Sequence, residues 1–375
     1  MRSFNPKAAV PGLLVTTALL STAILGACGD RQPLASARQP LVVPHVTTLQ
    51  EFECVGTTAG RVSCSRAAAA NARGVIIGNQ NVNIKLTSSN VSYDAGTGIF
   101  QFDVTVQNLL NEAIGTPDGM VADTDGIQVF FHTGPTTTVG TGEITVENAD
   151  GVGTFTSGNQ PYYAYHTILT KDQVSPAKTW MFKFPSTVTT FRFSVFVETD
   201  VQYLLVINEM LVNPGGLITD ASGEWIELYN AGSLKVNLQN LVIADSAAAG
   251  RRAYHLIAES VVVQPGAYVT LGRTTNTTSN GGVPIDYVYT MSGFPNSLGA
   301  FKVARVYGTD TLTVDRTQYA KAAVSAQNGV SRELTNPALD NSDMDGSNWA
   351  DALVTAVYGP GGRGTPKAQN STFTP

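Results

Sequence analysis

"LLVINEMLVNP", residues 204–214, and "GEWIELYN", residues 223–230, decide the fold of the second half of this chain. Both runs are rich in β-branched, leucine and aromatic residues, which favour strands, and both contain glutamates among those apolar residues. Glu224 and Glu227 are an odd number of positions apart, so in a strand their side chains point to opposite faces of the sheet. They cannot form one acid pair, and Glu209 is the carboxylate that could approach one of them across neighbouring strands.

The residues before position 201 show the same two-residue period. Apolar side chains occupy alternate positions over residues 82–86, 100–106 and 191–197, and short strand-like runs are separated by turns rich in Gly, Pro, Asn and Asp. No amphipathic helical pattern of several turns appears in the sequence. The pattern predicts an all-β protein with two immunoglobulin-like β-sandwiches in tandem, over residues 73–200 and 201–375.

The order and register of the runs after position 201 resemble the lamin tail domain family. The resemblance covers roughly residues 201–373, and its most specific elements are Ile207-Asn208-Glu209, Glu224-Trp225-Ile226-Glu227-Leu228-Tyr229-Asn230, Pro265-Gly266 and Gly364-Thr365-Pro366 with Asn370. The chain departs from the family at Lys367, where many relatives carry a small residue. The resemblance implies an immunoglobulin-like β-sandwich. It also implies a domain of the kind that is appended to varied secreted surface proteins of bacteria.

The N-terminus has the composition of a bacterial lipoprotein signal. Arg2 and Lys7 precede an apolar stretch over residues 8–27 that ends in small residues, and Cys28 follows at the position that a lipobox requires. An ordinary signal peptide with a chance cysteine is the alternative, while Pro11 argues against a transmembrane helix. We therefore expect a signal peptide over 1–27, acylation of Cys28 and a flexible tether over 28–50. These features predict a bacterial cell-envelope protein that is lipid-anchored on the extracytoplasmic side. The outer membrane is favoured over the inner one, and the choice between them stays open.

Cys54 and Cys64 flank a glycine-containing turn, so both thiols can meet across a hairpin over residues 51–72. In an oxidising compartment such a pair predicts a disulfide that staples the hairpin.

The composition and the motifs argue against several functions. Charged residues make up 14% of the chain against an average of about 25%, the net charge is −6, and no basic run is present, so nucleic acid is not expected as a partner. The sequence contains no nucleophile elbow, no phosphate-binding loop and no histidine pair with metal-ligand spacing. We expect a non-catalytic display, adhesion or binding module whose partner is the membrane and an envelope protein or polysaccharide. The alternative is an accessory module of, or a weak, carbohydrate or phosphoester hydrolase that uses Glu209 and Glu227.

One acidic loop resembles a calcium site. In "PALDNSDMDGSNWAD", residues 337–351, oxygen-bearing side chains alternate at Asp340, Asn341, Asp343 and Asp345 before a glycine. Calcium loops use such hard ligands, but the bidentate glutamate expected at the end of the loop is missing. A loop of Asx turns is the alternative, and no other cofactor is expected.

Overall fold

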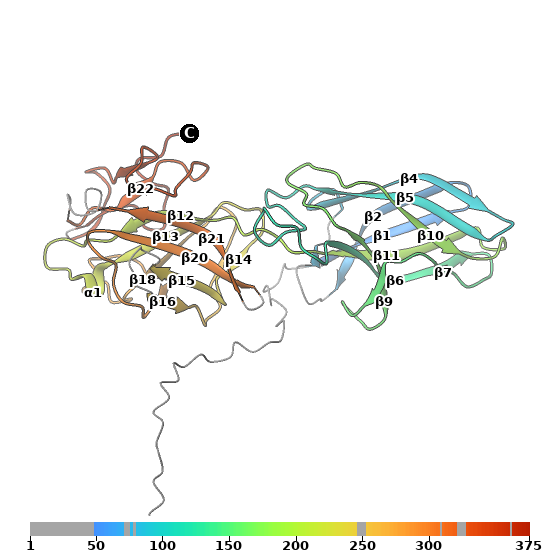
Figure 1. The fold of residues 1–375 in the computed structure, drawn as a ribbon, viewed down its shortest axis with the longest axis horizontal. Coiled ribbons are helices and arrows are strands. Elements are labelled where there is room, and N and C mark those ends of the chain that lie inside the picture. The colour runs from blue at the N-terminus through green and yellow to red at the C-terminus, as the bar shows by residue number, and fades with distance from the viewer. Residues whose placement is uncertain are drawn as a thin grey trace, which may run out of the picture. The chain divides into compact units, whose positions relative to one another are not determined.

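The computed structural model describes residues 49–70, 76–77, 80–245, 253–307, 310–320, 328–360 and 362–375. Within these ranges the chain forms β-strands and one short helix, α1 (Asp220–Gly223), as Figure 1 shows. The prediction of an all-β fold is confirmed. The predicted signal peptide, Cys28 and the predicted tether up to residue 48 lie outside the described residues. No helix in the described part of the chain is long and apolar enough to span a bilayer.

The first sandwich consists of the strands β1 (Leu49–Thr57), β2 (Arg61–Ala70), β3 (Ile76–Ile77), β4 (Ile84–Asp94), β5 (Ile99–Asn108), β6 (Ile127–Val139), β7 (Thr145–Val146), β8 (Gly151–Gly153), β9 (Gln160–Tyr165), β10 (Lys178–Lys183) and β11 (Thr190–Glu198). One sheet has the strand order β2-β1-β11-β6-β9-β8, with β3 also paired to β11, and the facing sheet has the order β4-β5-β10-β7. The pairings within both sheets are antiparallel.

Aromatic side chains fill the space between these two sheets. Along β5 the residues alternate strictly between buried and half-buried, so Phe100 and Phe102 both point inward. Trp180 of β10 stacks on Tyr163 with ring centroids 4.4 Å apart. Each large aromatic ring removes ~150–250 Å² from water, and this burial supplies most of the stabilisation of a sandwich.

The cysteine hairpin is part of the first sandwich. Strand β1 pairs with β2 on one side and with β11 on the other, and Cys54 lies directly opposite Cys64. The two sulfurs form a disulfide, and Cys54 and Phe52 belong to the core. The sequence interpretation treated residues 51–72 as a separate segment. The structure joins them to the sheet because Phe52 and Cys54 extend the apolar inner face of β11.

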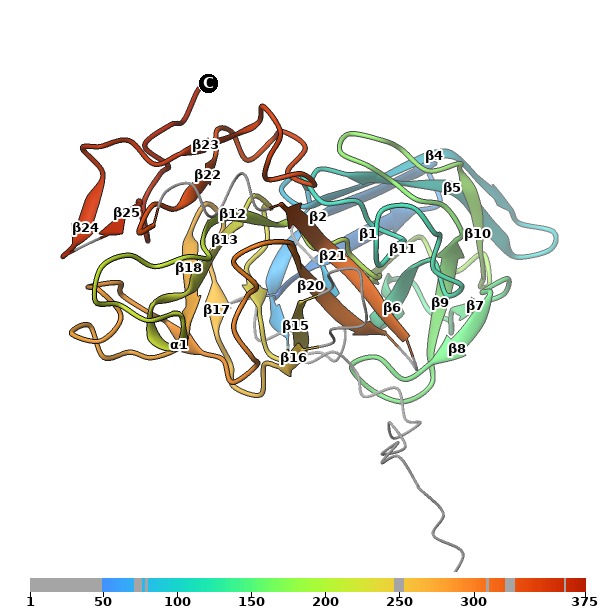
Figure 2. The same cartoon turned by 60° about the vertical axis from the view of Figure 1, so that its left-hand side comes forward.

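The second sandwich consists of the strands β12 (Leu205–Leu211), β13 (Trp225–Asn230), β14 (Val236–Asn237), β15 (Leu241–Asp245), β16 (Ala253–Leu256), β17 (Val262–Val263), β18 (Tyr268–Gly272), β19 (Tyr287–Val288), β20 (Gly299–Tyr307), β21 (Asp310–Tyr319), β22 (Arg332–Leu334), β23 (Trp349–Asp351), β24 (Val357–Gly359) and β25 (Gly362–Arg363). The larger sheet has the order β19-β18-β13-β12-β22-β23, and the facing sheet has the order β16-β15-β20-β21. The pairs β14-β17 and β24-β25 form two small sheets of their own. Figure 2 shows the strands of this domain turned toward the viewer.

Strand β13 divides its side chains between two environments. Ile226 and Leu228 point into the core between the sheets. Trp225, Glu227 and Tyr229 alternate with them and therefore point to the outer face of the larger sheet. Trp225 and Glu227 are nevertheless buried, because other segments of the chain cover this face. That cover creates the site described below.

Removing the disulfide tests the role of the hairpin. A cross-link that closes so short a loop contributes about 2–3 kcal/mol in the chain-entropy model. Replacing both Cys54 and Cys64 by alanine is expected to lower the free energy of unfolding by about this amount, measured by urea denaturation of the oxidised protein. Reduction of the wild-type disulfide should lower it by a similar amount. Equal urea midpoints for the oxidised, reduced and doubly substituted proteins would show that the hairpin contributes nothing through its cross-link.

Candidate functional site

Three glutamates from adjacent strands meet on the outer face of the larger sheet. Glu209 of β12 lies opposite Glu227 of β13 on one side and opposite Glu333 of β22 on the other. All three residues are fully buried, with 0% of their surface exposed. We call these three residues the carboxylate cluster. The sequence identified Glu209 and Glu227, but it gave no indication of Glu333, because β22 has only three residues and no alternating pattern.

The end of the chain closes over the carboxylate cluster. The backbone N–H of Thr365 donates to Glu209 Oε1 (2.9 Å), that of Lys367 to Glu227 Oε2 (2.5 Å) and that of Thr372 to Glu333 Oε2 (2.9 Å). We call residues 364–373 the C-terminal cover. Figures 1 and 2 both show the red end of the chain on the side of the domain that carries β22. Each carboxylate therefore receives a backbone hydrogen bond from the same short segment.

Two positions of the C-terminal cover explain the family motif. A Cβ atom on Gly364 would lie 2.6 Å from Glu209 Oε1 and 2.7 Å from Ser331 Oγ, so only glycine permits this close approach. Lys367 has a φ of +70°, a conformation that favours small residues such as glycine and asparagine. The chain tolerates lysine there, and its Nζ pairs with Asp286 at 2.7 Å.

Two asparagines complete the network around the carboxylate cluster. The register of β12 against β13 shifts between Ile207 and Glu209, and the resulting bulge turns Asn208 toward the covered face. Asn208 Nδ2 donates to Glu227 Oε1 (3.0 Å) and to Asn370 Oδ1 (2.8 Å). Asn370 Nδ2 in turn donates to the carbonyl oxygens of Asn208 (3.0 Å) and Leu334 (2.7 Å). These bonds tie the C-terminal cover to β12 and β22.

The position of Thr365 suits a proton on one of the carboxyls. Thr365 Oγ1 lies 3.0 Å from Glu209 Oε2 and 3.1 Å from Glu333 Oε1, yet its hydroxyl has a single proton to donate. Both bonds form when Glu209 is protonated and donates to Thr365, which then donates to Glu333. Burial, together with the charges of Glu227 and Glu333, raises the pKa of Glu209 well above its usual range. Burial also raises the pKa of Glu227 to about 8.

The remaining motif residues stabilise other parts of the domain. Trp225 forms a small apolar cluster with Leu211 and Val283 on the outer face. Asn230 Nδ2 donates to the carbonyl oxygens of Leu234 and Val263 and so holds the turn after β13.

Glu224 lies apart from the carboxylate cluster. Its Oε1 accepts the backbone N–H of Phe294 at 2.8 Å, and burial raises its pKa to about 8.

The three candidate aspartates of the acidic loop each use a carboxylate oxygen to accept a backbone N–H. Asp340 accepts the backbone N–H of Ser342, Asp343 accepts that of Asp345, and Asp345 accepts that of Ala320. Asn341 points inward and donates to Ile207 O. Among the described residues no group of three or more His, Cys, Asp or Glu side chains is arranged to hold a metal ion. The contacts of Asp340 and Asp343 are those of Asx turns, and calcium binding by the loop stays a prediction.

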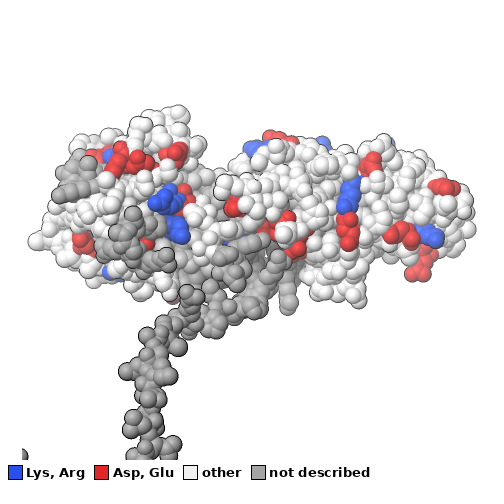
Figure 3. All heavy atoms as spheres, in the orientation of Figure 1, with Lys and Arg blue, Asp and Glu red and all other residues white. Residues whose placement is uncertain are grey.

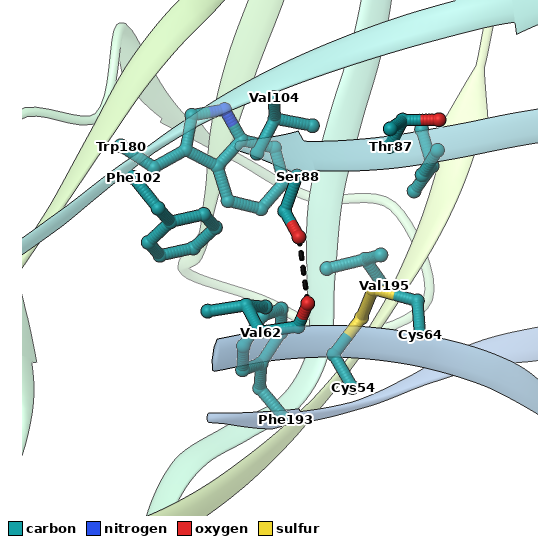
Figure 4. A pocket seen from close by; sticks show the side chains of 11 residues that line it. Cys54, Val62, Cys64, Thr87, Ser88, Phe102, Val104, Trp180, Phe193 and Val195 are labelled. Carbon is teal, nitrogen blue, oxygen red and sulfur yellow. Dashed lines mark hydrogen bonds between the residues drawn. A yellow bond between two sulfur atoms is a disulfide. The ribbon is translucent and has the colours of Figure 1, made fainter. Parts of the chain in front are cut away.

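Two hollows in the described structure differ greatly in size. The first lies inside the first sandwich beside the disulfide, as Figure 4 shows. It measures about 20 Å³, which is room for about one water molecule. The second opens on the second sandwich next to the carboxylate cluster and measures about 340 Å³. We call it the tyrosine cleft, lined among others by Tyr229, Tyr268, Asn336, Gln369 and Phe373. Its volume falls in the range of small-ligand sites.

Comparison with known proteins agrees with this geometry. The family model of the Lamin Tail Domain matches residues 202–352. The C-terminal domain is a lamin tail domain. No curated protein and no solved structure matches the chain. The matched residues contain the whole carboxylate cluster, while the C-terminal cover lies beyond them. The lamin tail domain family is a non-enzymatic, immunoglobulin-like family, and this fold suits a binding or display module.

The carboxylate cluster of this lamin tail domain lacks the access that catalysis needs. A glycosidase places two carboxyl groups on either side of a bond in an open site. Here Glu209 and Glu227 are adjacent but fully enclosed, and their oxygens accept hydrogen bonds from the chain itself. Their chemistry is therefore that of a structural network.

Replacing Glu209 by glutamine tests the protonation of the carboxylate cluster. The amide Nε2 can take the place of Oε2 and donate to Thr365, so Glu209→Gln mimics the protonated acid. A carboxyl whose pKa is raised by folding makes the folded chain bind more protons than the unfolded chain. The free energy of unfolding of the wild type should therefore fall as the pH rises from about 5 to about 8, followed by urea denaturation at each pH.

The fall with pH should be smaller in Glu209→Gln than in the wild type. Glu259→Gln, which changes an exposed glutamate, is the matched control and should keep the wild-type dependence. If Glu209→Gln and the wild type lose stability equally over this range, the glutamate is not protonated in the fold.

Proposed function

We propose that the protein is a membrane-anchored, extracytoplasmic binding module that presents two β-sandwiches and catalyses no reaction. The enclosure of Glu209 and Glu227 carries this proposal, because they are the acid pair that an enzyme of this fold would use. Both side chains are committed to holding the C-terminal cover. Partner binding then takes place at the surface of the domain, through loops and strand edges.

The N-terminal sequence supports export and anchoring. A positive segment, an apolar stretch and small residues precede Cys28, and an acylated cysteine holds a protein stably at a membrane when it carries two or more chains. The Cys54–Cys64 disulfide fits an oxidising compartment, because cytosolic thiols are kept reduced. On this proposal the tether places the sandwiches outside the cytoplasm, on the outer membrane of a bacterial envelope.

The surface supports a binding role toward uncharged or weakly charged partners. Charged side chains are sparse on the face that Figure 3 shows, where white atoms separate the few blue and red groups. A sparse charge pattern gives little long-range steering, so recognition depends on shape, hydrogen bonds and apolar contact. An envelope polysaccharide or protein meets these requirements, whereas nucleic acid does not.

One observation favours a second candidate, a weak hydrolase. The register of β12 against β13 sets Glu209 directly opposite Glu227, as a paired-carboxylate mechanism requires. Such an enzyme would have to lift the C-terminal cover to admit a substrate. It would cleave chromogenic glycosides or phosphodiesters, and Glu209→Gln would abolish the cleavage. The proposed binding module cleaves none of them.

Acylation of Cys28 is the direct test of the anchor. When the full chain is expressed in a bacterial host that is fed labelled palmitate, the wild type should carry the label and sediment with membranes. Cys28→Ser should lose the label and appear in the soluble extracytoplasmic fraction.

The double substitution of Cys54 and Cys64 by serine is the control for nonspecific labelling of thiols. It should keep both the palmitate label and the membrane association. An unlabelled wild type, or a labelled Cys28→Ser protein, would contradict the proposed anchor.

A further inference from the structure

The tyrosine cleft combines two aromatic rings with a polar rim. Tyr229 of β13 lies opposite Tyr268 of β18, and their ring centroids are 4.9 Å apart with the planes inclined by 38°. Both residues are half-buried, so each ring keeps part of its surface open to the cleft. Two neighbouring rings on a rigid sheet give the cleft an apolar platform.

The opposite wall of the tyrosine cleft is fixed before any ligand arrives. Phe373 belongs to the C-terminal cover, where its backbone N–H donates to Asn370 O (3.1 Å). Asn336 Nδ2 donates to Thr374 O (2.9 Å), and the Thr374 N–H donates to Thr335 O (2.9 Å). A wall held by these bonds loses little freedom on binding, which favours affinity.

Polar groups in the tyrosine cleft remain available to a ligand. Within the described part of the chain, the hydroxyls of Tyr229 and Tyr268 and the amide of the exposed Gln369 make no hydrogen bond to other protein groups. Burial raises the pKa of Tyr268 to about 12, so its hydroxyl stays a donor. The cleft thus offers hydrogen-bond donors and an acceptor beside its aromatic platform.

The lining of the tyrosine cleft also restricts the charge of its ligand. The residues that line it are aromatic, apolar or amide-bearing, and none of them is charged. The carboxylate of Glu227 is buried and accepts a hydrogen bond from Asn208, which lines the cleft. A phosphate or an acidic sugar would find no cation here to replace its lost hydration. A fully apolar ligand would leave the amide and hydroxyl groups unpaired.

We infer that the tyrosine cleft binds an uncharged carbohydrate, with one sugar ring against Tyr229 and Tyr268 and its hydroxyl groups bonded to Gln369 and the phenolic hydroxyls. A neutral sugar has an apolar face for the rings and polar edges for the rim, which matches both halves of the lining. The volume of about 340 Å³ accommodates one or two sugar units. The inference rests on the proposed binding function and names the ligand class of that module.

Calorimetric titration tests this inference. The full chain, purified in mild detergent, is titrated with tetrasaccharides of glucose, mannose, xylose and N-acetylglucosamine, and with an acidic uronic tetrasaccharide as the charged comparison. At least one neutral tetrasaccharide should bind, and the acidic one should not. Absence of binding by every neutral tetrasaccharide, or binding of the acidic one alone, would overturn the inference.

Matched variants locate the binding. Tyr268→Ala should weaken binding at least about tenfold, the change that a loss of ~1.4 kcal/mol produces. Tyr268→Phe should weaken it less, because the ring remains. Gln369→Ala should weaken binding and leave the melting temperature unchanged, because Gln369 is exposed. This variant therefore tests the cleft even if a tyrosine variant does not fold. Tyr254→Ala changes a tyrosine on β16 that is 70% exposed, and it should bind as the wild type does.

The outcomes separate this inference from the proposed anchor. A chain that is acylated at Cys28 but binds no neutral tetrasaccharide overturns the inference and leaves the anchored module in place. Binding that survives Tyr268→Ala and Gln369→Ala equally well places the sugar elsewhere and also overturns it. Binding in a chain that is not acylated supports the inference and contradicts the anchor alone.

Discussion

Burying three carboxyl groups side by side is the constraint on which the second sandwich depends. Removing a carboxylate from water costs several kcal/mol unless protons or donors compensate, and no ion pair among the described residues includes Glu209, Glu227 or Glu333. The compensation comes from backbone N–H groups of the C-terminal cover, and the position of Thr365 Oγ1 between Glu209 and Glu333 suits one bound proton. The sheet therefore depends on the C-terminal cover for donors to its buried carboxylates, and the same hydrogen bonds fix the position of the C-terminal cover.

This mutual dependence links the family motif to the surface available for binding. Gly364 lets the chain pass close to Glu209, Asn370 fastens it to β12 and β22, and Phe373 then forms a wall of the tyrosine cleft. Glu209 and Glu227, which resemble a catalytic pair in the sequence, thus contact the C-terminal cover and not the ligand. They fix the segment that shapes the cleft, and the uncharged groups of Tyr229, Tyr268 and Gln369 are left to meet a partner.

The sequence predicted the features that are encoded locally. Alternation identified β5 and β11, and strand-forming residues identified β12 and β13. The two-residue period of a strand separated Glu224 from Glu227. Glu333 escaped prediction because β22 is short and its partner β12 lies far away in the chain. The tyrosine cleft escaped for the same reason, since Tyr229, Tyr268 and Phe373 come from three distant segments. The placement of the cysteine hairpin in the first sheet likewise depends on its pairing with β11, which no local pattern reveals.

The protonation of buried glutamates at neutral pH is the central claim, and carboxyl NMR measures it directly. Protein labelled with ¹³C at the glutamate carboxyls is titrated from acid to alkaline pH, and Glu209→Gln and Glu227→Gln assign the two resonances. The account predicts that Glu227 titrates near pH 8 and that Glu209 titrates well above the ordinary glutamate range. Titration of both carboxyls near the ordinary glutamate value of about 4.3 would contradict it.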